Sequence, residues 1–115
     1  MPGFDVWDVV KVPFPYTDRP VREFRPALVV CSGSIEKVHG LLWILMITSA
    51  TNRGWPGDVE VSDLKVTGLP AASVVRTAKI ATIECKEAHR IGSLPDEDRK
   101  TVRLLMRTIL GGAMG

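Results

Sequence analysis

The segment Leu41–Thr48 (LLWILMIT) constrains the fold more than any other part of this chain, because it stays apolar until its last residue. Its short length and the preceding Gly40 favour a β-strand over a helix, and a strand without polar alternation is covered on both faces. In a small barrel the outer face of such a strand needs a helix or a second subunit, which points to a homodimer. Seven apolar residues in a row fall far short of the ~20 needed to span a bilayer, so we expect no membrane association.

Short strands separated by turn-forming residues dominate the rest of the chain. Segments rich in β-branched residues predict strands, and about six of them suggest a small barrel or sandwich. Because prolines interrupt a central ladder, we expect a long loop over Pro13–Phe24. The predicted strands are Val6–Val12, Ala27–Cys31, Leu41–Thr48, Val59–Val61, Ala72–Arg76 and Lys79–Glu84, with Arg90–Gly92 as a last short pairing segment.

The C-terminal segment has a helical rather than a strand-like pattern. Its apolar residues follow the i, i+3, i+4, i+7 spacing of an amphipathic helix, and they are Val102, Leu105, Met106, Ile109 and Leu110. Pro95 and the acidic residues after it suit a helix start, and Gly111-Gly112 suits a helix end. We therefore expect a mainly β chain closed by one C-terminal amphipathic helix. Its apolar stripe is expected to pack on the core, with contact to a second subunit or a partner protein as the lesser alternative.

Length and cysteine content bound the class of protein. The 115 residues suit a single domain covering 1–115. The net charge of +2 is too small to indicate a nucleic-acid partner by itself. Cys31 and Cys85 form no CxxC motif, and the N-terminus lacks the pattern of a signal peptide. We expect a protein of the reducing cytoplasm.

No familiar set of metal-binding or nucleophilic residues occurs in the sequence. His39 and His89 do not have metal-ligand spacing. There is no glycine-rich phosphate loop and no nucleophile elbow, and the acidic residues are scattered. An enzyme built on this chain is therefore expected to work without a metal or cofactor.

The remaining candidates for chemistry are arginines and hydroxyl groups. Arg19, Arg22 and Arg25 gather near Glu23, and a planar guanidinium fits a phosphate bidentately. Arg25 lies where the loop meets a buried strand, and Thr48 lies at the exit of the central strand. By position alone, Arg25 could simply pair with an acidic neighbour, and Thr48 could be an ordinary strand residue.

A cation and a hydroxyl at one point would suffice for RNA cleavage by the neighbouring 2′-OH. That reaction needs alignment, stabilisation of negative charge on the phosphorane and the transfer of two protons. Arg25 would stabilise the charge, Thr48 would hydrogen-bond a phosphate oxygen, and Glu23 is the nearest candidate base. Other candidate substrate-binding residues are Ser49, Arg53, Trp55 and Arg76. Each also has a structural interpretation: a turn hydroxyl, solvated basic residues and a hydrophobic cap.

Several stretches in a fixed order resemble the PemK/MazF toxin family from about Asp5 to the final helix. They are Asp8–Val10 with Val12–Asp18, Arg25–Val30 (RPALVV), Ile47–Ser49 (ITS), Gly68–Pro70, Ser73–Arg76 and Ile91–Leu94. One departure is Trp7, where the family commonly has glycine. We expect that change to alter local packing more than chemistry.

The resemblance implies an SH3-like β-barrel with a C-terminal helix, assembled as a homodimer. It implies a sequence-specific, metal-independent endoribonuclease that cleaves single-stranded RNA and is blocked by a cognate antitoxin. The catalytic arginine and threonine of such toxins correspond to Arg25 and Thr48. Two alternatives remain: a non-catalytic gyrase poison, which shares the barrel, and a plain SH3-like nucleic-acid-binding module.

Overall fold

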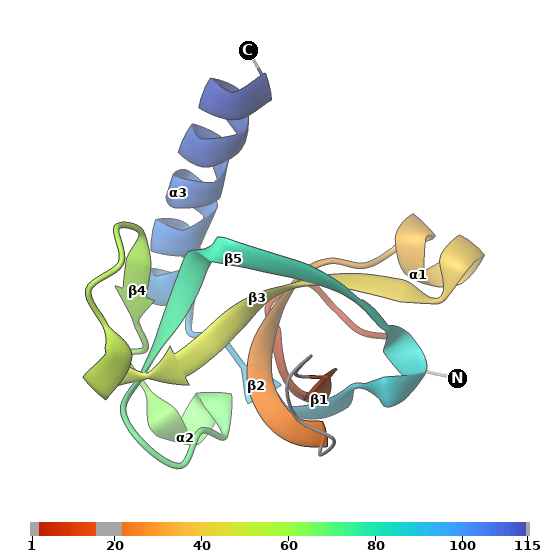
Figure 1. The fold of residues 1–115 in the computed structure, drawn as a ribbon, viewed down its shortest axis with the longest axis horizontal. Coiled ribbons are helices and arrows are strands. Elements are labelled where there is room, and N and C mark those ends of the chain that lie inside the picture. The colour runs from red at the N-terminus through yellow and green to blue at the C-terminus, as the bar shows by residue number, and fades with distance from the viewer. Residues whose placement is uncertain (1–2, 16–21, 115) are drawn as a thin grey trace.

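The computed structural model describes residues 3–15 and 22–114, and within them the chain forms one antiparallel sheet and a long C-terminal helix (Figure 1). The sheet order is β4-β5-β3-β2-β1-β6. Its strands are β1 (Asp8–Pro15), β2 (Arg22–Cys31), β3 (Leu41–Ser49), β4 (Asp58–Glu60), β5 (Ser73–Glu84) and β6 (His89–Ser93). The helical elements are α1 (Ser34–His39), η1 (Ala50–Asn52), α2 (Leu64–Thr67), η2 (Cys85–Glu87) and α3 (Asp96–Met114). The predicted mainly β class with a terminal helix is confirmed.

The central strands are buried on both faces, as the apolar run in β3 predicts. Leu45 and Ile47 belong to one core cluster, which Val102 of α3 covers. Leu42 and Ile44 alternate with them into a second cluster. The curvature of the sheet therefore lets one chain cover both faces, except at Trp43, which is 44% exposed.

The structure differs from the sequence-based prediction in three places, and proline or glycine accounts for the first two. The residues Pro13 and Pro15 lie inside β1, which pairs with β6 only over Asp8–Lys11. Beyond Lys11 that edge needs no backbone donors, so proline is tolerated. The helix α3 runs through Gly111-Gly112 to Met114, because glycine lowers helix stability by about 1 kcal/mol but keeps its N–H.

The third difference is that Ala72–Arg76 and Lys79–Glu84 belong to one strand. The ladder between β3 and β5 shifts from Leu45↔Ile80 to Met46↔Arg76, so three extra residues bulge from β5 without ending it. Bulges of this kind bend a strand and increase its twist. The bend of β5 is visible in Figure 1.

The short helix α2 links the open ends of the sheet. It follows β4 and contacts β6. Asp63 caps its start by accepting hydrogen bonds from the backbone N–H groups of Lys65 and Val66. Gly68 ends it in the left-handed region, at φ 72°. The segment that follows α2 is thereby directed toward the end of β3.

The first half of α3 packs on the core, whereas its second half projects from the sheet (Figure 1). Val102 is fully buried, but Leu104, Ile109 and Leu110 are 66%, 40% and 49% exposed. The prediction that the whole stripe packs in the core is therefore wrong for Ile109 and Leu110, because the helix extends beyond the face it covers. Within the described residues, no helix is long and apolar enough to cross a membrane.

Trp7 occupies a backbone conformation that normally favours glycine. Its φ is 82°, which costs a residue with a side chain about 1–2 kcal/mol. The Trp7 N–H donates to the Val29 carbonyl at 2.8 Å, and its carbonyl accepts from the Leu94 N–H at 2.9 Å. The ring packs against the core cluster under α3. These contacts hold the strained backbone in place.

Candidate active site

The structure brings Arg25 and Thr48 to one cavity, although they lie on different strands. The register between β2 and β3 pairs Ala27 with Met46. Two residues further toward the same end of the two strands lie Arg25 and Thr48, and both residues line a cavity of about 290 Å³. The spatial relation on which the sequence-based site depends is therefore present.

Five segments form the walls of this cavity. They contribute Lys11 of β1, Phe24–Pro26 of β2, Ile47–Ser49 of β3, the segment Leu69–Ser73 and Ile91 of β6. The segment Leu69–Ser73 is placed by α2, because Gly68 packs directly against the Ile91 backbone. The cavity thus depends on contacts between parts of the chain that are distant in sequence.

Arg25 is half-buried and paired with Glu23. The Arg25 Nη2 donates to Glu23 Oε2 at 3.1 Å, and the two side chains are 41% and 39% exposed. Residues two apart on a strand lie on the same face, so the strand itself sets this pair. The carboxylate limits the orientations open to the guanidinium at the cavity wall.

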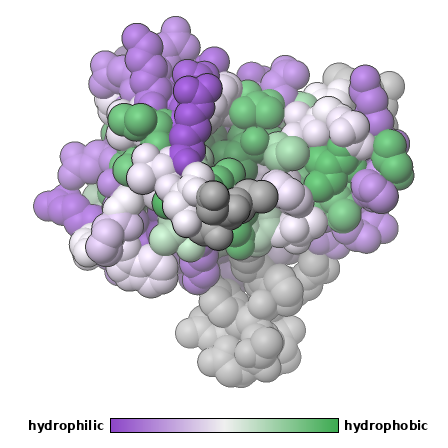
Figure 2. Space-filling view, turned by 90° about the horizontal axis from the view of Figure 1, so that it is seen from above, coloured by the Kyte–Doolittle hydropathy of each residue, from purple (hydrophilic) through white to green (hydrophobic). Residues whose placement is uncertain are grey.

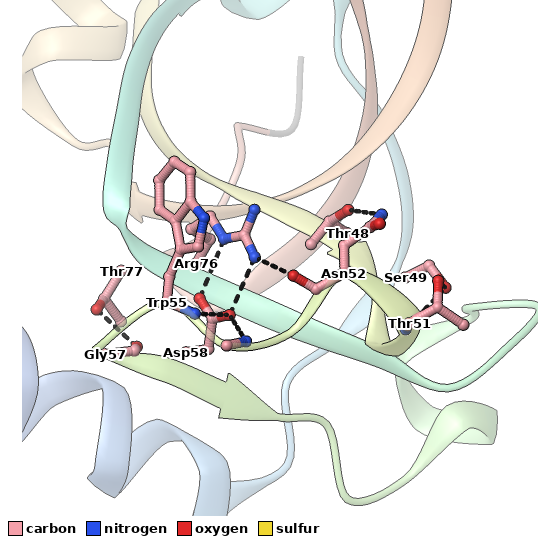
Figure 3. A network of polar contacts seen from close by, with 10 residues as sticks. Thr48, Ser49, Thr51, Asn52, Trp55, Gly57, Asp58, Arg76 and Thr77 are labelled. Carbon is pink, nitrogen blue, oxygen red and sulfur yellow. Dashed lines mark hydrogen bonds and ion pairs between the residues drawn. The ribbon is translucent and has the colours of Figure 1, made fainter.

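Thr48 is held by a residue of the turn that follows β3 (Figure 3). The Asn52 Nδ2 donates to Thr48 Oγ1 at 3.1 Å. Ser49 begins the turn η1, and its Oγ accepts from the Thr51 N–H at 3.3 Å and lies 3.0 Å from Thr51 Oγ1. The Ser49 hydroxyl is therefore engaged in local structure as well as lining the cavity.

Comparisons with known proteins identify the family. A family model described as PemK-like, MazF-like toxin of type II toxin–antitoxin system matches residues 5–110. The chain belongs to this toxin family. A comparison with curated protein sequences finds no match.

Solved structures of similar proteins support the fold. A MazE–MazF structure from Deinococcus radiodurans matches at 23% identity and a TM-score of 0.75, covering 96% of this chain and 98% of that one. The Mycobacterium tuberculosis toxin MazF-mt6 matches at 20% identity and a TM-score of 0.69, covering 90% and 96%. An endoribonuclease in complex with its cognate antitoxin from a Mycobacterial species matches at 17% identity and a TM-score of 0.71, covering 91% and 92%. At these identities the likeness concerns the fold.

Arg76 of this PemK/MazF-like chain does not lie in the cavity as a solvated basic residue. Its side chain is 11% exposed and its Nε and Nη2 donate to the Asp58 carboxylate at 3.1 and 3.0 Å. The hydrogen bond from Arg76 lowers the pKa of Asp58 below its usual value, because it stabilises the carboxylate. These donors are committed within the protein and Arg76 is not among the residues that line the cavity, so the structure lends no support to the prediction that Arg76 binds substrate.

Two other predicted binding residues of this toxin-family chain, Arg53 and Trp55, are not among the residues that line the cavity. Arg53 is exposed and 3.7 Å from Glu60, and Trp55 is 48% exposed, with the Arg76 guanidinium 4.1 Å from its ring centroid. Arg19 lies outside the described residues, and for Arg22 only the backbone is described, at the start of β2. Among the described residues, no group of three or more His, Cys, Asp or Glu side chains could hold a metal ion.

Proposed function

We propose that this chain is a sequence-specific endoribonuclease toxin that cleaves single-stranded RNA by attack of the 2′-OH, without a metal ion. The observation that carries the proposal is the shared cavity of Arg25 and Thr48 in a member of a toxin family. Because the reacting hydroxyl and phosphate both belong to the substrate, the protein needs only to align them and to move charge and protons.

Arg25 and Thr48, which line the cavity, and Glu23, which pairs with Arg25 beside it, each have a role in this reaction. The 2′ oxygen forms a bond to phosphorus while the bond to the 5′ oxygen breaks, leaving a 2′,3′-cyclic phosphate and a 5′-hydroxyl. Arg25 donates hydrogen bonds to the phosphorane oxygens, and Thr48 donates one more. Glu23, 3.1 Å from the guanidinium, accepts the 2′ proton. The departing 5′ oxygen takes up a proton from Arg25 or from water.

The flanking nucleotides would bind beyond the cavity. Trp55 exposes about half of its surface, which suits stacking with an unpaired base. Arg53 and the basic residues Arg19 and Arg22 supply positive charge for the phosphate backbone, and Ser49 lines the cavity beside Thr48.

A cleavage assay in EDTA tests this function. We expect the purified chain to cut a long single-stranded RNA at a short recurrent sequence and to leave cyclic phosphate ends. A matched RNA with one 2′-deoxy nucleotide at the mapped position should resist cleavage at that position alone. Intact RNA across varied sequences would contradict the proposal and favour a gyrase poison or a binding module.

We propose further that the chain forms a homodimer through the apolar groove beside α3. The groove has a volume of about 340 Å³ and is lined by residues of β2, β3, β5 and α3 and of the segment before β1. Figure 2 shows apolar residues in several places on the face seen from above, among hydrophilic ones. Its apolar lining includes Val6, Trp7, Val30, Trp43, Ile80, Met106 and Leu110. Exposed apolar surfaces of this kind typically mark interfaces.

Ile80→Lys is expected to dissociate this dimer. Ile80 is 51% exposed in the single chain, so the substitution should leave the subunit folded while it buries a charge in the interface. We expect the dissociation constant to rise by about 30-fold or more, measured by analytical ultracentrifugation. Val38→Lys, at a 73% exposed residue of α1 outside the groove, is the matched control. A wild-type chain that sediments as a monomer would remove the dimer proposal.

The proposed regulator is a cognate antitoxin. The family description refers to toxin–antitoxin systems, and two of the similar structures are complexes with an antitoxin or with MazE. An antitoxin segment that covered the cavity of Arg25 and Thr48 would exclude RNA. Action on messenger RNA would place the chain in the cytoplasm.

A further inference from the structure

A chain of hydrogen bonds connects Thr48 with a buried ion pair on another strand (Figure 3). The Asn52 side chain donates to Thr48 Oγ1 at 3.1 Å. The backbone carbonyl of the same Asn52 accepts from Arg76 Nη2 at 2.7 Å. Arg76 also donates twice to Asp58 of β4. Asn52 is therefore fixed through its backbone and contacts Thr48 through its side chain.

The direction of the bond between Asn52 and Thr48 determines what the hydroxyl can do. A threonine hydroxyl has one proton and two acceptor sites. Because the Asn52 amide donates to the oxygen, the hydroxyl proton is not directed at Asn52. It can point into the cavity that Thr48 lines, where an oxygen of an RNA phosphate would accept it. Asn52 thus favours the donor orientation of Thr48.

The Arg76–Asp58 ion pair, which holds the Asn52 carbonyl, is buried and fixed by several contacts. The side chains of Arg76 and Asp58 are only 11% and 7% exposed. The Trp55 ring covers the guanidinium at 4.1 Å, and Asp58 Oδ2 also accepts from the backbone N–H groups of Gly54 and Trp55 at 3.3 Å each. The pair therefore ties both ends of the loop between β3 and β4 to β5, and Asn52 lies in that loop.

We propose that Asn52 is a positioning residue for RNA cleavage, which holds the Thr48 hydroxyl as a donor toward the phosphate and is itself held by the Arg76–Asp58 pair. The proposal rests on the proposed ribonuclease function. It assigns to Asn52 and Arg76 an action through Thr48, with no contact between either side chain and RNA.

A double-mutant cycle between Asn52 and Thr48 tests the proposal. Asn52→Ala keeps the backbone carbonyl that Arg76 binds and removes only the amide. We expect the single-turnover cleavage rate constant to fall by about 10- to 100-fold, while the affinity for an RNA with a 2′-deoxy nucleotide at the cleaved position stays unchanged. In a Thr48→Val background the same substitution should have no further effect on the rate constant. An equal loss in both backgrounds would overturn the proposal.

Asn52→Asp examines the direction of the hydrogen bond. A carboxylate has the same shape as the amide but only accepts, so it would draw the Thr48 proton away from the cavity. We expect this variant to cleave more slowly than Asn52→Ala in the Thr48 background. The comparison in the Thr48→Val background measures the effect of the added charge alone. Cleavage by Asn52→Asp at the wild-type rate would contradict a positioning role for the amide.

Arg76→Lys extends the test to the ion pair. An ammonium group cannot reproduce the planar fork that reaches Asp58 and the Asn52 carbonyl together, so we expect a rate loss that again disappears in the Thr48→Val background. Val59→Ala is the matched control, because Val59 is a buried neighbour of Asp58 in β4 and bears on stability alone. Its cleavage rate per folded molecule should be that of the wild type. A loss for Arg76→Lys that persists without the Thr48 hydroxyl would overturn the role of the pair.

Different results would contradict the proposed ribonuclease site and the proposed positioning role of Asn52. If Thr48→Val and wild type cleave at the same rate, the site assignment is wrong and the positioning role of Asn52 falls with it. If Thr48→Val is slow but Asn52→Ala is fully active, the ribonuclease site stands and only the positioning proposal is removed.

Discussion

Replacing Arg25 with alanine is expected to lower the cleavage rate constant by about 10²–10³-fold, the effect typical of removing one preorganised donor to a developing charge. Arg25 is the cation of β2 that lines the cavity with Thr48, and it would face the phosphorane where negative charge accumulates. Single-turnover cleavage of a short RNA that contains the mapped site measures the effect. Because the Arg25 side chain is half-buried, at 41% exposure, the fold should persist, which circular dichroism can verify.

Two further variants separate the geometry of Arg25 from its charge. Arg25→Lys keeps the charge but loses the planar fork, so we expect it to restore only a small part of the rate. Lys86→Ala removes a cation from η2, where the side chain is 76% exposed and outside the cavity, and we expect it to cleave as the wild type does. If Arg25→Ala and Lys86→Ala behaved alike, the assignment of Arg25 as the charge-stabilising group would have to be abandoned.

Local patterns predicted the strands whose environment is set by their own residues. The apolar run of β3 correctly indicated burial on both faces, because each face of a strand is visible in alternate residues. Prediction from local patterns fails where a residue distant in sequence determines whether a segment forms a strand. Pro13 fits β1 only because β6 is too short to pair beside it, and Arg76 and Lys79 share one strand because β3 accommodates the bulge between them.

In the candidate site, too, the sequence predicts what local residues determine but not what a distant partner determines. Arg25 and Thr48 could be singled out because each lies within a stretch that resembles a known family. Thr48 does lie near the end of β3, but β2 begins at Arg22, so the expectation that Arg25 marks the start of its strand is wrong. Nothing local in the sequence reveals that Arg76 pairs with Asp58 on β4, so the sequence pattern cannot distinguish a solvated arginine from one held in a buried ion pair. Asn52 was missed altogether, although its position four residues after Thr48, in the polar stretch that ends the apolar strand, was a usable signal.

The contact between α2 and β6 should make Gly68 the glycine least tolerant of substitution. A Cβ at Gly68 would lie 2.2 Å from the Ile91 carbonyl oxygen, and φ there is 72°. Gly68→Ala therefore combines left-handed strain of about 1–2 kcal/mol with a backbone overlap that costs about 1–3 kcal/mol. We expect a loss of about 2–5 kcal/mol in the free energy of unfolding, measured by urea denaturation.

Two other glycines separate the two contributions to that loss. Gly40 ends α1 in the same left-handed region, at φ 67°, with nothing within 4 Å of an added Cβ, so Gly40→Ala should show the strain alone. Gly92→Ala should show the overlap alone, because its Cβ would lie 2.4 Å from the Thr67 carbonyl carbon. Since α2 also places the Leu69–Ser73 wall of the cavity, Gly68→Ala and Gly92→Ala should slow RNA cleavage per folded molecule, whereas Gly40→Ala should not. Equal stability of the Gly68→Ala and Gly40→Ala variants would show that α2 and β6 are not in close contact, and the wall of the proposed site would then lack its support.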